Sequence, residues 1–393
     1  MRPRLPWLLG LGAVLAVGVG LAGHQAARTH VRTMMGGVDA PIGCASCHVY
    51  MNPGPVVRSI LEEDYLSPRD LAFSPDGSRL FVVAEEAGAV LEVAVEDGSV
   101  ARRIDVGRRP HSVVVSPDGR TAYVTNGWTD DVSVIDVATG AVGATIPVGM
   151  NPAGLAVSND GGTLFVANRG SDDVSIIDLA QGCETRRLRA GNNPYAVRLS
   201  RDGGLLYVTN RLTEGTTVGE SPRTEVTIVD VAAGRVTERQ VLRGAHLAEG
   251  IDIAPAGDLA LVTVVRPNNL LPASQVAQGW MLTYGLAAVR TGSTDAPVQV
   301  LLDDVNAYYA DPHDVVITPD GGRAFVTHSA ADVVTAIDLP ALRRVLDAAS
   351  PDSVALFANH LGLSQRYVAA RIPVGANPKR MAVSPDGRRV YVT

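Results

Sequence analysis

Residues 109–126 read RPHSVVVSPDGRTAYVTN, and this phrase recurs along most of the chain. Six further copies begin at residues 67, 151, 193, 245, 311 and 377, and the copy at 245 is the most degraded. The first copies lie about forty residues apart, which is a period typical of repeat architectures. The repeat therefore decides the fold class.

Each copy contains signals for strands and tight turns. The alternating SVVVS predicts a strand, and the Pro-Asp-Gly that follows predicts a turn that needs a permissive glycine. YVTN ends a second strand, VSVID (132–136) predicts a third and GATIPVG (143–149) a fourth. Four antiparallel strands in about forty residues predict a propeller blade and not a sandwich. We expect an all-β, most simply seven-bladed, β-propeller.

The repeated SPDG, YVTN and VSVID resemble the YVTN family of β-propeller repeats. That family is similar in fold to lactonase-like propellers and to the haem d1 propeller of cytochrome cd1 nitrite reductase. The resemblance covers residues 56–393 and implies the fold. It implies no single activity, because propellers host many functions.

The ends of the repeat array raise the question of ring closure. VVRSILEE (Val56–Glu63) matches the fourth strands of other blades, so we expect it to complete the last blade. That blade has its first two strands and the sequence then stops at Thr393, which suggests a truncated chain. Seven blades is the best count, and eight stays open.

The N-terminus carries an export signal. After MRPR, residues 5–23 are apolar and uncharged, which fits a cleaved signal peptide or a retained inner-membrane anchor. Both alternatives predict a periplasmic location. A net charge of −7 and a pI near 5.6 argue against binding to nucleic acid.

Residues 44–48 read CASCH, the attachment sequence for a c-type haem. Cys44 and Cys47 can form thioethers to the haem vinyl groups, and His48 is placed to ligate the iron. We therefore predict one covalent haem in a segment of residues 24–55. The third cysteine, Cys183, is interpreted as an unpaired structural residue.

The sixth haem ligand cannot be assigned from its spacing. The eight residues from His48 to Val56 keep the haem on the far face or rim of the propeller. An insertion at residues 340–366, with the apolar spacing of two short helices, is the expected wall beside it. His360 in this insertion is a candidate distal ligand, although a solvent-facing histidine on a decoration is the alternative.

The first strand of each blade should line the central channel. The residues that follow the strand-opening proline form what we call the ring: Arg69, His111, Ala153, Tyr195, Glu249, His313 and Lys379. The set is polar and differs between blades, which is typical of a ligand site on a pseudo-symmetry axis. Solvated lining without a function is the alternative.

His111 and His313 are expected to face each other across the ring, where imidazoles of near-neutral pKa would suit proton transfer or metal ligation. A non-covalent haem d1 on either histidine is a lesser alternative implied by the cd1 resemblance. Loops at residues 211–225 and 266–280 are long enough to form a lid on the same face. His328, which replaces the asparagine of YVTN, lies near that face.

Three functions follow from these features. The first is an exported c-type haem propeller in periplasmic electron transfer or oxidoreduction, acting on a small substrate or docking a redox partner protein. The second is a non-catalytic binding or scaffold propeller with a haem segment. The third is a lactonase-like hydrolase, which gives CASCH no role.

Overall fold

The repeats form successive four-stranded antiparallel sheets in the computed structural model, which describes residues 66–215, 220–267, 281–293, 295–305 and 307–393. Blades 1 to 3 contain the strands β1 (Pro68–Phe73), β2 (Arg79–Ala84), β3 (Ala89–Ala94), β4 (Val100–Asp105), β5 (Pro110–Val115), β6 (Thr121–Asn126), β7 (Asp131–Asp136), β8 (Val142–Pro147), β9 (Pro152–Val157), β10 (Thr163–Asn168), β11 (Asp173–Asp178) and β12 (Cys183–Arg189).

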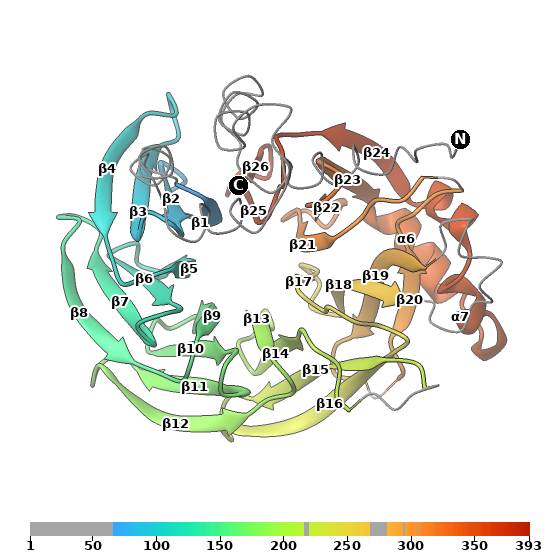
Figure 1. Ribbon diagram of the computed structural model, residues 1–393, viewed down its shortest axis with the longest axis horizontal. Coiled ribbons are helices and arrows are strands. Elements are labelled where there is room, and N and C mark those ends of the chain that lie inside the picture. Colours follow the sequence, from blue (N-terminus) through green and yellow to red (C-terminus); the bar gives the residue numbers. More distant parts are fainter. Residues whose placement is uncertain (1–65, 216–219, 268–280, 294, 306) are drawn as a thin grey trace, which may run out of the picture. The chain divides into compact units, whose positions relative to one another are not determined.

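Blades 4 to 6 contain the strands β13 (Pro194–Leu199), β14 (Leu205–Asn210), β15 (Arg223–Asp230), β16 (Arg235–Arg243), β17 (Ile251–Ile253), β18 (Leu259–Pro267), β19 (Leu282–Arg290), β20 (Val298–Leu301), β21 (Pro312–Ile317), β22 (Arg323–His328), β23 (Val333–Asp338) and β24 (Val368–Pro373). Blade 7 shows two described strands, β25 (Met381–Val383) and β26 (Val390–Val392). The first strands surround the axis and the fourth strands lie outermost (Figure 1). The all-β propeller fold is confirmed.

The turn between the first two strands shows why the repeat contains Ser-Pro-Asp-Gly. In blade 2, Ser116 Oγ donates to Asp118 at 2.6 Å, and the Gly119 N–H donates to the Ser116 carbonyl at 2.9 Å. Gly119 has a φ of 73°, which a residue with a side chain rarely adopts. The glycine also lies against the preceding blade, since a Cβ there would stand 3.3 Å from Pro75.

The same contact closes the ring between blade 7 and blade 1. A Cβ on Gly77 would lie 3.2 Å from Pro385 Cδ, which repeats the contact seen between successive blades. Phe73 and Tyr391 meet edge to face across this junction, with ring centroids 5.2 Å apart. Blade 7 therefore packs directly on blade 1, and the ring has seven blades.

The predicted insertion in blade 6 forms helices. They are α6 (Leu339–Asp347), α7 (Pro351–Phe357) and the 3₁₀ helix η1 (Leu361–Arg366). Asp338 caps α6 by accepting a hydrogen bond from Ala341 N at 2.7 Å. Ser350 begins α7 in a capping box with Ser353.

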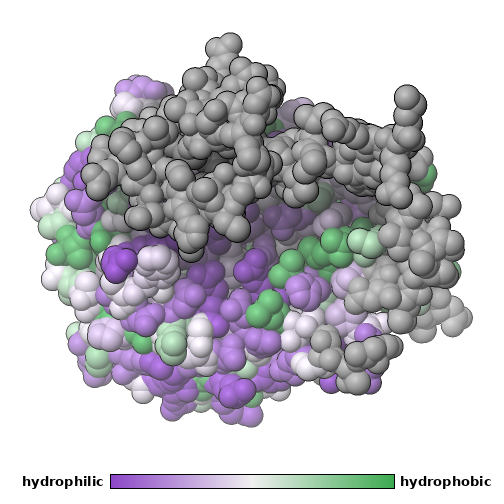
Figure 2. Space-filling view, in the orientation of Figure 1, coloured by the Kyte–Doolittle hydropathy of each residue, from purple (hydrophilic) through white to green (hydrophobic). Residues whose placement is uncertain are grey.

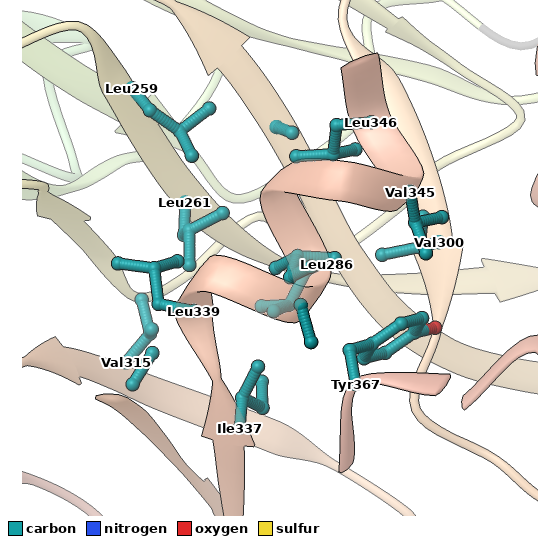
Figure 3. Packing of buried hydrophobic residues seen from close by; sticks show 14 of the residues in the cluster. Leu259, Leu261, Leu286, Val300, Val315, Ile337, Leu339, Val345, Leu346 and Tyr367 are labelled. Carbon is teal, nitrogen blue, oxygen red and sulfur yellow. The ribbon is translucent and has the colours of Figure 1, made fainter. Parts of the chain in front are cut away.

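The insertion packs against blade 5, while the haem motif beside which we expected it lies outside the described residues. Leu342 and Leu346 of α6 share one buried cluster with Leu261, Leu286 and Val300 of blade 5 (Figure 3). Blade 5 has a short outer strand, so the helix supplies the apolar cover that a longer strand would give. Pro340 and Arg344 of α6 line a cavity of about 590 Å³ between blades 6 and 7.

Several expectations fall outside the described residues. They are the export segment at 5–23, the haem motif at 44–48 and the closing strand at 56–63. The parts of the lid loops at 216–219 and 268–280 are likewise not described. Among the described residues, no helix is long and apolar enough to cross a membrane.

Candidate functional site

Each ring residue is positioned by an entry turn that repeats around the propeller. The residue before the strand-opening proline has a left-handed backbone, with a φ of 51° at Arg109, 50° at Asn151 and 58° at Asn193. The backbone N–H groups of the two asparagines donate to Asp130 and Asp172 of the preceding blades, at 2.7 and 2.8 Å. Asparagine tolerates this conformation better than most residues. The turn delivers the next side chains to the axis.

The threonine of YVTN connects this ring to the neighbouring blade. Thr125 Oγ1 donates to the Ala153 carbonyl at 2.7 Å, and Thr209 Oγ1 donates to the Glu249 carbonyl at 2.9 Å. Thr327 Oγ1 donates in the same way to the Lys379 carbonyl at 2.8 Å. The backbone at the ring positions is therefore fixed by hydrogen bonds between blades.

Most of the ring side chains fill the axis and do not line an open mouth. Tyr195 is fully buried, and His111, Glu249 and His313 are between 1% and 3% exposed. Ala153 is also fully buried and packs in one cluster with Tyr195. Only the remaining two members, Arg69 and Lys379, keep partly exposed side chains.

Tyr195 lies at the centre of a hydrogen-bonded chain. Arg69 Nη2 donates to Tyr195 Oη at 2.7 Å and lies 3.2 Å from His111 Nε2. Tyr195 Oη lies 3.2 Å from His313 Nε2, which is 3.7 Å from Glu249 Oε2. Both imidazoles meet the Tyr195 ring edge to face, with centroids 5.3 and 5.9 Å away. The structure thus brings together five of the seven predicted ring residues.

Both ring histidines are neutral at physiological pH. Burial, followed by the nearby Arg69, lowers the pKa of His111 well below 6.5, and burial followed by Arg380 does the same for His313. The neutral state agrees with the contacts, because Arg69 can only donate and His111 Nε2 must therefore accept. The expectation of near-neutral pKa values on the axis is wrong, since the ring is buried and surrounded by cations.

Three arginines around Tyr195 were not predicted from the sequence. The guanidinium carbons of Arg169, Arg211 and Arg380 lie 5.7, 5.5 and 5.4 Å from the Tyr195 ring centroid. Arg169 and Arg211 follow the asparagines of FVAN and YVTN, so equal positions in neighbouring blades were the available signal. Arg380 follows the ring position of blade 7 and pairs with buried Asp314 at 3.0 Å.

Burial also shifts the pKa values of the acidic and basic groups of this cluster. It raises the pKa of Glu249, although Arg211 at 2.5 Å opposes the shift. It raises the pKa of Asp70, which accepts the Val113 N–H of the next blade at 3.2 Å. It lowers the pKa of Lys379. The cluster is therefore a dense set of buried and half-buried charges around one phenol.

The comparisons with known proteins agree with this propeller. Residues 57–188 match the family model described as Lactonase, 7-bladed beta-propeller. The hydrazine synthase subunit beta of Kuenenia stuttgartiensis is 28% identical over 175 residues, or 44% of this chain. The solved hydrazine synthase of that organism superposes with a TM-score of 0.79 at 28% identity, over 84% of this chain and 93% of that chain.

The chain is similar to a subunit of hydrazine synthase. The matched sequence spans 45% of the curated hydrazine synthase subunit beta, while the structural match covers most of both chains. Because the structural match covers 84% of this chain, the similarity to hydrazine synthase includes most of the propeller.

Exposed apolar side chains lie in the loops of the ring face, both within blades and between them. Seven of the large exposed hydrophobic residues lie in these connections or at their ends: Leu66, Trp128, Met150, Leu212, Met281, Leu282 and Val305. Trp128 is 59% exposed, and the guanidinium carbons of Arg108 and Arg109 lie 5.2 and 4.9 Å from its ring centroid. Figure 2 shows one face of the propeller, on which hydrophobic side chains lie among hydrophilic ones near the axis.

The remaining candidates lie away from the ring. His328 is fully buried, its Nδ1 donates to the Tyr309 carbonyl at 2.6 Å, and its Nε2 lies 2.8 Å from Thr335 Oγ1, so it supports the fold. Cys183 begins β12 as an exposed free thiol. His360 is exposed at the start of η1 and makes no capping hydrogen bond. The described residues contain no group of three or more His, Cys, Asp or Glu that could hold a metal ion.

Proposed function

We propose that this chain is an exported, c-type haem-bearing propeller subunit that docks a redox partner protein over its ring face. The observation that carries the docking proposal is the set of exposed apolar side chains in the loops of the ring face, with Trp128 and Met150 among the largest of them. Tryptophan, methionine and arginine are enriched in protein interfaces, and tryptophan and arginine also dominate their hot spots. The similarity to hydrazine synthase subunit beta supports a role inside an assembly.

The haem part of the proposal rests on the sequence alone. Cys44 and Cys47 would hold the group and His48 would ligate its iron, with His360 as a distal candidate. A bound haem would supply one-electron redox chemistry. The apolar segment at 5–23 supports periplasmic delivery, where such attachment takes place, either as a soluble protein or with an inner-membrane anchor.

The buried ring favours a docking module over an enzyme that acts at the axis. Burial raises the pKa of Tyr195, and its hydroxyl is engaged by Arg69 and His313. Burial also leaves no ring histidine with a near-neutral pKa for proton transfer. These features support partner docking. A lactonase-like hydrolase is the second candidate, favoured by the family model that matches residues 57–188.

Docking can be tested by the native mass of the tagged chain recovered from its source organism. The Trp128→Ala/Met150→Ala double variant removes two exposed anchors, and Val100→Ala is the matched control, because Val100 is 57% exposed at the opposite end of its blade. The chain and the Val100 control should elute with a haem- or flavin-containing protein in fixed stoichiometry. The double variant should lose that complex by at least tenfold in apparent affinity.

Two results would contradict docking over the ring face. The first is a complex that survives unchanged in the double variant. The second is a chain that elutes alone in every form and opens lactone substrates with turnover, which would favour the hydrolase.

A further inference from the structure

Four cationic side chains from four different blades converge on the ring face above Tyr195. Arg69 and Lys379 belong to the ring, while Arg169 and Arg211 follow β10 and β14. Their side chains are only partly exposed: 20% for Arg69 and Lys379, and 38% for Arg211. Burial lowers the pKa of Arg169 most, and the nearby charges of Arg69 and Arg211 lower it further. The fold thus holds these four cations close together despite their mutual repulsion.

The neighbouring carboxylates compensate these charges incompletely. Arg69 reaches Glu85 only at 3.8 Å, and Glu85 is shared with Arg109 at 3.3 Å. Lys379 reaches Asp311 only at 3.9 Å. Contacts of this length are at the limit of an ion pair, so the carboxylates neutralise the charges of Arg69 and Lys379 only in part.

Arg169 has no carboxylate within ion-pair distance in the described part of the chain. Its Nη2 donates instead to the neutral Asn151 Oδ1 at 2.8 Å, and its plane lies over the Tyr195 ring. Its Nε, the Nε of Arg69 and the Nδ1 of His313 are buried and have no hydrogen-bond partner among the described residues. Buried polar atoms without a partner are rare in proteins, because leaving them unpaired is costly.

We infer that the ring face binds a small oxyanion or carboxylate between Arg69, Arg169 and Lys379. The site offers donors and positive charge, which an anion satisfies and a metal cation does not. Guanidinium groups match the planar oxygens of such anions in pairs. The ligand must be small, because Tyr195 and the histidines fill the axis beneath. This site goes beyond the docking role and needs no partner protein.

Lys379 gives this inference a direct probe, because it is the only lysine in the chain. Its pKa is lowered, chiefly by burial, which increases the share of the amine that is unprotonated and open to acylation. An anion beside it would raise that pKa and shield the amine. The rate of acylation at Lys379, read by peptide mass spectrometry, therefore reports occupancy of the site.

The experiment uses the isolated chain and inorganic phosphate as the probe anion. Phosphate should slow acylation of Lys379 at least fivefold with a saturating dose response, while sodium chloride at equal ionic strength should not. Arg169→Gln should require at least about tenfold more phosphate, as expected for the loss of a charged hydrogen bond. Arg169→Lys keeps the charge and should recover part of the protection.

Arg187→Gln is the matched control, because Arg187 pairs with Glu184 at 2.6 Å on the outer strand of the same blade. This variant should be protected like the unchanged chain. Equal protection by phosphate and chloride, or full protection in a folded Arg169→Gln protein, would overturn the inference. Neither result would bear on partner docking, since no partner is present.

Discussion

Replacing His328 with asparagine should make the stability of the protein less sensitive to acid. The histidine takes the place of the asparagine that ends the second strand in blades 2, 3 and 4. In blade 2, Asn126 Nδ2 donates to Ser133 Oγ at 2.9 Å, and Thr335 holds the corresponding position beside His328. An asparagine side chain therefore has a partner at residue 328. The hydrogen bond to the Tyr309 carbonyl and the edge contact with the Tyr309 ring are lost.

The magnitude follows from the pKa of His328. Burial lowers this pKa from 6.5 to about 3, while unfolding returns the imidazole to water. Below pH 6.5 His328 binds a proton in the unfolded chain but not in the folded chain, so the free energy of unfolding falls as the pH falls. The slope is about 1.36 kcal/mol per pH unit for one group. Between about pH 7.5 and about pH 5, His328 should therefore cost about 2 kcal/mol.

Urea unfolding of both proteins at these two pH values measures the effect. The stability of the His328→Asn variant relative to the unchanged chain should rise by about 2 kcal/mol on acidification. The lost hydrogen bond to Tyr309 adds a constant that cancels in this double difference. His111 and His313 also lower the free energy of unfolding as the pH falls. Asp303, whose pKa burial raises to about 6, raises it. These three groups are present in both proteins, so their effects cancel in the comparison. An equal gap at the two pH values would refute a buried neutral His328.

Two further predictions concern the packing of the blades and the haem. Gly154→Ala should lower the free energy of unfolding by about 1–3 kcal/mol, because a Cβ there would lie 2.6 Å from the Tyr195 carbonyl oxygen. Gly143→Ala, which meets nothing within 4 Å, should be nearly neutral in the same denaturant titration, and equal effects of the two changes would count against close packing at the axis. The chain exported with a cytochrome c maturation system should keep its haem in a denaturing gel, and Cys44→Ala/Cys47→Ala should lose it. A colourless band from the matured, unchanged chain would exclude covalent haem.

The repeat predicted the blades because each strand and turn is specified locally. The serine, aspartate and glycine of SPDG supply the hydrogen bonds and the positive φ of the turn within five residues. The convergence of His111, Tyr195 and His313 was predictable for a similar reason, since each occupies the same position in its copy. Residues at the same position in different repeats therefore lie around a common axis.

The chemistry of the axis could not be read in the same way. The arginines at 169, 211 and 380 meet Tyr195 through the reach of long side chains from separate blades. The equal repeat positions of Arg169 and Arg211 place both on one face but do not show which side chain they contact. Burial of the histidines depends on how the ring side chains fill the channel together, so their lowered pKa values were missed. The apolar face of α6 was visible in the sequence, but the choice of blade 5 depends on the short β20, which only the folded sheet reveals.

Docking over the ring face is tested most directly at Lys379. Because the chain has no other lysine, a lysine-reactive cross-linker applied to the purified native complex reports on this face, apart from the N-terminal amine. In phosphate-free buffer, Lys379 should cross-link to the partner protein and should react with a small acylating reagent several-fold more slowly than in the isolated chain. A complex in which Lys379 forms no cross-link and reacts as fast as in the isolated chain would contradict docking at the ring.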